Sequence, residues 1–365
     1  MKENRKVIII TGAAGFLGSA ITVKLENSCR VIAVDNRIPS SLLRLKTPNV
    51  QWFHDDITHR KSVSGIFKKV LKKHGRIDFV LHLAFFWHFG TDYRLEYLKI
   101  NDEGTRNIVD LCRKFHCKRL VFASTLSVLS QVAGNQKLNE KSKPESNLPY
   151  AQSKISSELM LVKTSTDLPF TILRIGAVFS EWCELPPLYI LIKHWSRKSW
   201  MGRTIPGKGN TGFPYIHRDD VVDIVKKVIV RNDQLDTCEW FLACGSKTLV
   251  HTDLFPVIRK CLGHDDCHDS IHLPVWFVRL VLHFKCVAGK ITGRMADERP
   301  WMMDHVDKPW IVDNSYTQEK LDWTCREGRD LLKCMPQMID NFNKYQEAWI
   351  ERMNRRNKRV YEYEG

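Results

Sequence analysis

A glycine-rich turn between an apolar strand and a helix constrains the fold of this 365-residue chain more than any other feature. Residues 6–10 (KVIII) are apolar and rich in β-branched side chains, which is typical of a buried strand. The turn, residues 11–18 (TGAAGFLG), follows, and the apolar positions Ile21 and Leu25 predict a helix after it. A strand, a glycine turn and a helix in this order form the phosphate-binding unit of a dinucleotide fold.

Each glycine of the turn has its own physical role. Gly12 permits the tight turn, Gly15 lets the backbone approach a pyrophosphate, and Gly18 allows the helix to pack closely on the strand. The first-turn amides and the helix dipole then face the anion. The residues of the turn predicted to bind the cofactor are Gly12, Ala14, Gly15, Phe16, Leu17 and Gly18.

A carboxylate follows the second predicted strand. Residues 30–34 (RVIAV) end at Asp35, about twenty residues after the glycines, where a carboxylate binds the adenosine ribose hydroxyls. Because this charge repels a 2′-phosphate, we predict NAD as the cofactor rather than NADP, although Arg37 lies only two positions later.

A tyrosine and a lysine four residues apart supply the matching chemistry. On a helix, Tyr150 and Lys154 would lie on the same face, so the lysine ammonium can stabilise the tyrosine phenolate. A free tyrosine has a pKa of about 10 and is a poor base at neutral pH without such a neighbour. Chance surface spacing also produces such a pair, so its weight depends on the glycine turn upstream.

Together these motifs resemble those of the extended short-chain dehydrogenases/reductases, in the NAD-dependent epimerase/dehydratase group. That group has the glycine pattern TGxxGxxG, and the resemblance covers roughly the first 250 residues. Four further segments that resemble the group occur in its order, namely residues 54–57 (HDDI), 80–84 (VLHLA), 101–105 (NDEGT) and 120–125 (LVFAST).

The resemblance implies roles for residues in these segments. Asp56 and Ile57 are expected to contact the adenine, and Leu83 and Ala84 to lie beside the cofactor. Asn101 is expected to support a network of waters in the active site.

The resemblance also implies a catalytic hydroxyl at Thr125, with Ser124 and Ser127 nearby. A threonine hydroxyl can donate a hydrogen bond to a substrate oxygen as a serine does. In hydride transfer to or from a nicotinamide, the oxygen on the reacting carbon loses or gains a proton. We expect Tyr150 to be that acid/base, Lys154 to lower its pKa and bind the nicotinamide ribose, and Thr125 to orient the oxygen.

The substrate is indicated less directly. Nucleotide-sugar members of the group usually carry an asparagine shortly after the arginine at position 174 and an arginine in the loop 209–215, and both are missing here. Residues 174–179 (RIGAVF) look more like the 3β-hydroxysteroid dehydrogenase-like branch. We predict that Phe85, Phe86 and Trp87 form an apolar substrate wall; packing in the core is the alternative.

Apolar strands alternate with amphipathic helices up to about residue 180, which predicts an α/β fold, a Rossmann doubly wound parallel sheet with a smaller mixed C-terminal substrate domain. We expect residues 1–180 to bind NAD(P), with a return segment at about 215–250. Residues 181–214 and 251–345 would bind the substrate, and residues 346–365 form a basic tail.

The net charge of +15 is spread along the chain without a nucleic-acid-binding module, so we predict no nucleic-acid partner. The eleven cysteines and fourteen histidines show no paired ligand spacing, which predicts reduced thiols, no metal site and a cytoplasmic protein. The resemblance implies a homodimer. The apolar segment 273–292 predicts a helix over the substrate cleft, with peripheral membrane contact as the alternative.

Three functions follow from this sequence. The first is an NAD-dependent oxidoreductase that transfers a hydride at a hydroxyl or keto carbon of an apolar or ring-shaped substrate. The second is a nucleotide-sugar epimerase or dehydratase that recycles its NAD internally. The third is a non-catalytic NAD(P)-binding scaffold. The presence of Thr125, Tyr150 and Lys154 together argues against it.

Overall fold

A parallel sheet of seven strands forms the centre of the computed structural model, which describes residues 5–130, 137–292 and 297–348. The strand order is β11-β6-β5-β4-β1-β2-β3. These strands are β1 (Val7–Thr11), β2 (Arg30–Asp35), β3 (Gln51–His54), β4 (Phe79–His82), β5 (Arg119–Thr125), β6 (Phe170–Ile175) and β11 (Cys238–Ala243). From residue 349 on, the predicted basic tail lies outside the described residues.

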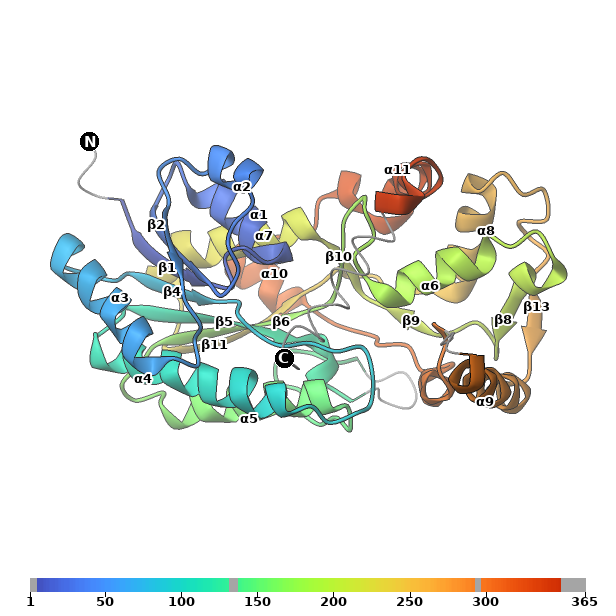
Figure 1. The fold of residues 1–365 in the computed structure, drawn as a ribbon, viewed down its shortest axis with the longest axis horizontal. Helices are drawn as coiled ribbons and strands as arrows, with labels where there is room; N and C mark the ends of the chain where they lie inside the picture. The colour runs from blue at the N-terminus through green and yellow to red at the C-terminus, as the bar shows by residue number, and fades with distance from the viewer. Residues whose placement is uncertain (1–4, 131–136, 293–296, 349–365) are drawn as a thin grey trace.

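Helices cover both faces of this sheet (Figure 1). One face carries α1 (Phe16–Leu25), α7 (Arg218–Val230) and α10 (Ser315–Leu321), and the other carries α3 (Arg60–His74), α4 (Thr105–Lys114) and α5 (Pro149–Lys163). Side chains of β1 alternate between the two cores: Ile8 and Ile10 enter the first, and Val7 and Ile9 the second. Both faces of the strand are buried, which is why its sequence is an unbroken apolar run. The predicted doubly wound sheet is confirmed.

A smaller lobe lies beyond the carboxyl ends of the strands, at the right of Figure 1. It contains β7 (Ala177–Phe179), α6 (Pro186–Trp195), β8 (Thr204–Pro206), β9 (Gly212–Phe213), β10 (Tyr215–His217), β12 (Leu249–Val250), α8 (His251–Cys261), β13 (Ile271–Leu273), α9 (Val275–Thr292) and α11 (Leu331–Lys344). Its core gathers Trp195 from α6, Phe255 from α8 and Met335 from α11. Between these elements the chain returns to the sheet twice. Residues 218–243 form α7 and β11, and after α9 Leu321 and Trp323 pack in the first core of the sheet.

A buried ion pair fixes α5 to the sheet. Arg174 of β6 and Glu158 of α5 are 2.8 Å apart and have side chains only 3% exposed. The second carboxylate oxygen of Glu158 accepts a hydrogen bond from the Ser124 hydroxyl of β5 at 2.5 Å. Arg174 also donates to the carbonyls of Glu140 and Ser142. The helix that carries Tyr150 and Lys154 is thus held to two adjacent strands by charged hydrogen bonds.

We predict that Glu158→Leu destabilises the protein strongly, because it leaves the Arg174 guanidinium buried without its counter-ion. The free energy of unfolding should fall by about 3–5 kcal/mol, and adding Arg174→Met should recover part of the loss. Urea unfolding of both variants measures this. A double variant no more stable than Glu158→Leu would show that the unpaired charge is not the cause.

Candidate active site

The glycine turn packs against the end of β4. Gly12 has a φ of 71°, and a Cβ atom there would lie 2.7 Å from the amide nitrogen of Ala84. A Cβ atom on Gly18 would lie 2.0 Å from the carbonyl oxygen of Gly12. The Leu83 amide donates to the Thr11 carbonyl at 3.1 Å. Only glycine fits both positions, so α1 begins as close to β1 as the backbones allow.

The carboxylate of Asp35 lies at the end of β2 and is engaged by the chain itself. It accepts hydrogen bonds from the Ala14 amide at 2.8 Å and from the Arg37 guanidinium at 2.8 and 2.9 Å. This bidentate pairing neutralises the charge that would repel a 2′-phosphate. An adenosine ribose that binds Asp35 has to share the carboxylate with Arg37 or displace it.

The two residues expected at the adenine lie on the same cavity as the turn. The Asp56 carboxylate accepts hydrogen bonds from the Thr58 amide at 2.8 Å and from the Asn36 side chain at 3.3 Å. Ile57 is buried against Gly104, where a Cβ atom would lie 2.6 Å from the isoleucine Cδ1. The structure therefore brings together the cofactor-binding residues predicted from distant segments.

Lys154 is almost completely buried, and its surroundings change its chemistry. Its ammonium donates to the Ala123 carbonyl at 2.9 Å and lies 4.5 Å from the Phe85 ring and 4.6 Å from the Phe122 ring. Burial lowers the pKa of Lys154 to about 7, against the opposing charge of Glu158. Such a lysine can exchange a proton near neutral pH.

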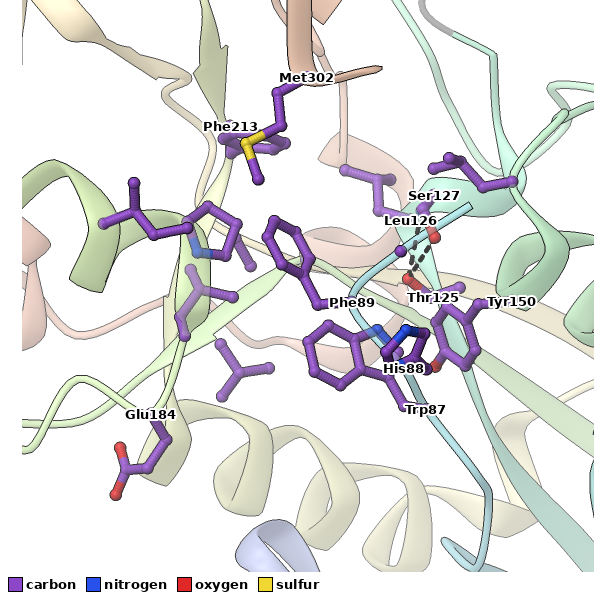
Figure 2. Close-up of a pocket in the computed structure, with 18 of the residues that line it drawn as sticks. Trp87, His88, Phe89, Thr125, Leu126, Ser127, Tyr150, Glu184, Phe213 and Met302 are labelled. Carbon is purple, nitrogen blue, oxygen red and sulfur yellow. Dashed lines mark hydrogen bonds between the residues drawn. The ribbon is translucent and has the colours of Figure 1, made fainter. Parts of the chain in front are cut away.

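Tyr150 and Thr125 lie on the wall of the same cavity (Figure 2). The Tyr150 ring lies 5.9 Å from the Phe85 ring and 6.5 Å from the Trp87 ring. The Thr125 hydroxyl is 3.0 Å from that of Ser127, whereas Ser124 is committed to Glu158 in the interior. Of the two neighbouring hydroxyls at the end of β5, Thr125 is therefore the one still available on the cavity side.

Asn101 has a structural task that the sequence did not indicate. It lies in a π-helical turn, η1 (Tyr97–Gly104). Its side chain accepts from the Phe86 amide at 2.7 Å and donates to the Phe86 carbonyl at 2.9 Å and to the Ser153 hydroxyl at 2.9 Å. Asn101 thus fixes the backbone of residues 85–89, the aromatic segment, against α5.

The aromatic segment itself divides between two environments. Phe85 and Trp87 lie beside Tyr150, whereas the Phe86 ring is 7% exposed and packs edge-on against Tyr97 at 5.2 Å between centroids. Phe86 also lines the cavity, but its ring is held against Tyr97.

The cavity measures about 1510 Å³ and extends from the glycine turn into the smaller lobe. In Figure 2 the side chain of Phe89 extends from the aromatic segment toward Phe213 and Met302. Sequence reasoning missed most of its outer lining, because these residues come from separate loops and helices and share no local pattern. They are Phe89, Phe213, Phe277, Trp301, Met302 and Trp310.

The charges of the outer cavity compensate one another. The Glu298 carboxylate lies 3.3 Å from the His194 ring and 4.0 Å from the Arg197 guanidinium. The hydrogen bond from His194, assisted by the charges of Lys285, His194 and Arg197, lowers the pKa of Glu298 to about 2 against its partial burial. The Glu298 carboxylate thus offsets part of the positive charge near the outer cavity.

Within the part of the chain that the structure describes, no cluster of His, Cys, Asp and Glu side chains could hold a metal ion. In the same residues no helix is both long and apolar enough to cross a membrane.

Comparison with known proteins agrees with this geometry. Residues 8–242 match the model of the NAD dependent epimerase/dehydratase family. The chain belongs to this family. The resemblance inferred from the motifs is confirmed, and so is the prediction of an oxidoreductase-type enzyme.

The similar proteins include a dTDP-D-glucose 4,6-dehydratase of Dictyostelium discoideum, 26% identical over 62% of this chain. The match spans 56% of that dehydratase's own length. A UDP-glucose 4-epimerase of Caenorhabditis elegans is 24% identical over 88% of this chain and 93% of its own. A sterol-4-alpha-carboxylate 3-dehydrogenase (decarboxylating) of Candida albicans is 29% identical over 35% of this chain and 37% of its own length.

Solved structures show the same fold. A UDP-glucose 4-epimerase of Thermotoga maritima with UDP-glucose superposes with a TM-score of 0.68, at 21% identity over 93% of this chain and 99% of that one. A dTDP-glucose 4,6-dehydratase of Bacillus anthracis in complex with NAD gives a TM-score of 0.67, at 17% identity over 95% and 99%.

We predict a dependence of stability on pH that originates in Lys154. Its folded pKa of about 7 lies below the ordinary 10.5, so between these values the unfolded chain binds a proton that the folded chain does not. The contribution of Lys154 to the free energy of unfolding should therefore rise with pH between about 7 and 10.5. Below pH 7 the buried lysine is charged in the folded protein, and its destabilising effect is greatest there.

Lys154→Met should remove this contribution and stabilise the protein most below pH 7, with the gain vanishing toward pH 10.5. Urea unfolding across this pH range measures it. The matched control is Lys163→Met, an exposed lysine on the same helix, which should keep the parent profile. Equal pH slopes in Lys154→Met and the parent would contradict the assignment.

Proposed function

We propose that this protein is an NAD-dependent oxidoreductase that transfers a hydride at a hydroxyl or keto carbon of an apolar or ring-shaped substrate. The observation that carries the proposal is the position of Thr125 and Tyr150 on a cavity whose outer half is mainly aromatic and aliphatic. Lys154 is buried one helical turn after Tyr150, with its ammonium 4.5 Å from the ring of Phe85, which lines the cavity. Bound at the glycine turn, NAD would supply the hydride acceptor.

The residues of this chain would handle the proton. Tyr150 takes the proton of the substrate hydroxyl as the hydride leaves its carbon, and returns it in the reverse direction. Lys154, which lies on α5 one turn after Tyr150, stabilises the tyrosine phenolate and binds the nicotinamide ribose. Thr125 donates a hydrogen bond that orients the substrate oxygen. Asn101 acts through the Phe86 backbone, which positions the neighbouring aromatic rings.

Two features support an apolar substrate over a sugar linked to a diphosphate. Nucleotide-sugar enzymes usually carry an asparagine shortly after the position of Arg174, and Gly176 in this stretch has no room for a side chain. A Cβ atom there would lie 2.5 Å from the Pro214 carbonyl oxygen and 2.8 Å from the Cys244 Cβ. Phe213 stacks on Trp310 at 5.0 Å in the loop where nucleotide-sugar enzymes usually place an arginine. Aromatic and aliphatic side chains form much of the outer lining, and such a wall favours an apolar ligand.

A second candidate is a nucleotide-sugar epimerase or dehydratase that reduces and reoxidises its NAD within one turnover. The similar proteins named for such activities favour it. The two candidates differ in one measurable quantity: only the first forms NADH in step with product.

The decisive experiment measures NADH formation from NAD by the purified protein with hydroxysteroids, other apolar alcohols and nucleotide sugars, with product analysis of every reaction. We expect NADH with an apolar alcohol and a loss of about 10²–10⁴ in turnover for Tyr150→Phe. Tyr97→Phe is the matched control, because its ring also lies near Tyr150 and burial raises its pKa to about 12. Its turnover should stay within a few-fold of the parent rate.

The outcomes separate the candidates. An altered nucleotide sugar without net NADH would establish the epimerase or dehydratase. Full turnover by Tyr150→Phe on the true substrate would sink the assignment of the acid/base. Tight NAD binding without turnover of any compound would favour a scaffold.

We also propose a homodimer formed through the α4 and α5 side of the molecule. Exposed apolar side chains gather there, with Leu98 on η1 and Leu159 and Val162 on α5 between 43% and 55% exposed. Sedimentation velocity should find the parent as a dimer and Leu159→Glu shifted toward the monomer, because a charge would be buried in the contact. A monomeric parent would exclude the dimer.

A further inference from the structure

Helix α9 (Val275–Thr292) carries a continuous apolar stripe on its outer surface. Its members are between 48% and 81% exposed, which is unusual for side chains so large. At 3.6 residues per turn they fall within an arc of about 80° that runs the length of the helix. They are Trp276, Leu280, Phe284, Val287 and Ile291.

The opposite face of α9 forms part of the cavity wall. Val278, Val281 and Leu282 line the cavity, and Leu282 is 4% exposed in a small core with Met303 and Val306. The helix therefore has apolar groups on both sides, with the cavity behind it and the surface of the molecule in front. Among the residues that the structure describes, packing within the chain accounts for the inner face only.

The charges on α9 indicate what kind of surface would cover the apolar stripe. The helix contains no aspartate or glutamate, and Arg279, His283 and Lys290 lie along one edge of the stripe. One of them, Arg279, pairs with Asp304 at 2.7 Å, just outside the helix. An apolar stripe beside a basic edge is the pattern of a helix that lies in a lipid–water interface.

We propose that the outer face of α9 docks on an anionic phospholipid bilayer. The stripe would enter the boundary of the acyl chains, and the basic edge would lie among the phosphates. A second copy of the chain fits this face poorly, because it would bring two basic edges together in a protein of net charge +15. The docking does not depend on the proposed reaction, but it would place one wall of the cavity at the membrane, where apolar alcohols dissolve.

Flotation of the purified full chain with vesicles tests this proposal. One set of vesicles is pure phosphatidylcholine, and the other is phosphatidylcholine mixed with phosphatidylglycerol. We expect the protein to float with the anionic vesicles, less with the neutral ones, and less again at high salt. The double variant Phe284→Glu, Ile291→Glu should bind the anionic vesicles at least about tenfold more weakly.

The matched control is Leu45→Glu, Val230→Glu, which adds the same charge at two equally exposed apolar positions away from α9. It should float nearly as the parent does, and circular dichroism should show that both variants are folded. Should the glutamates disturb the fold, Phe284→Ser, Ile291→Ser replaces them with the same expectation.

Three results would overturn the proposal. They are a parent that stays with the soluble fraction at low salt, equal losses of binding in the α9 and control variants, and a folded α9 variant that floats as the parent does. Because none of these readings uses turnover, they are independent of the substrate and of the acid/base assignment.

Discussion

The contact between the glycine turn and the end of β4 is the constraint on which the rest of the site depends. Gly12 and Gly18 allow β1, α1 and the segment after β4 to approach at backbone distance. The aromatic segment 85–89 continues directly from this contact, so its place over Lys154 is set by the same approach. A side chain at either glycine would separate these elements before any catalytic residue was positioned.

Buried charged side chains are the second constraint on the site. Glu158 and Arg174 form a buried ion pair. The ammonium of Lys154 lies nearby, where it donates to a backbone carbonyl and lies beside two aromatic rings. Removing water from a lysine in this way is costly to the fold, and the cost appears as a lowered pKa. A buried ionisable group with a strongly shifted pKa beside a cavity is typical of a functional site.

Much of this arrangement was predictable from local sequence. The sheet follows from β-branched runs between helical segments, and the cofactor-binding positions follow from the fixed spacing of the turn and Asp35. Features that depend on distant segments were not predictable. The clamp of Asn101 on Phe86 joins two segments through a π-helical turn, and Phe213 and Trp301 reach the cavity from elements with no shared period. The pairing of Arg37 with Asp35 depends on a side-chain conformation that spacing alone does not fix.

That last pairing supplies, within the chain, hydrogen bonds of the kind that a ribose would donate to the Asp35 carboxylate. Arg37 occupies the Asp35 carboxylate with two charged hydrogen bonds before any ribose arrives. Binding through Asp35 is then an exchange of partners, and the heat released by the new hydrogen bonds is offset by the bonds that Arg37 gives up. The Ala14 amide donates to the same carboxylate, so Asp35 joins the end of β2 to the glycine turn as well as to Arg37.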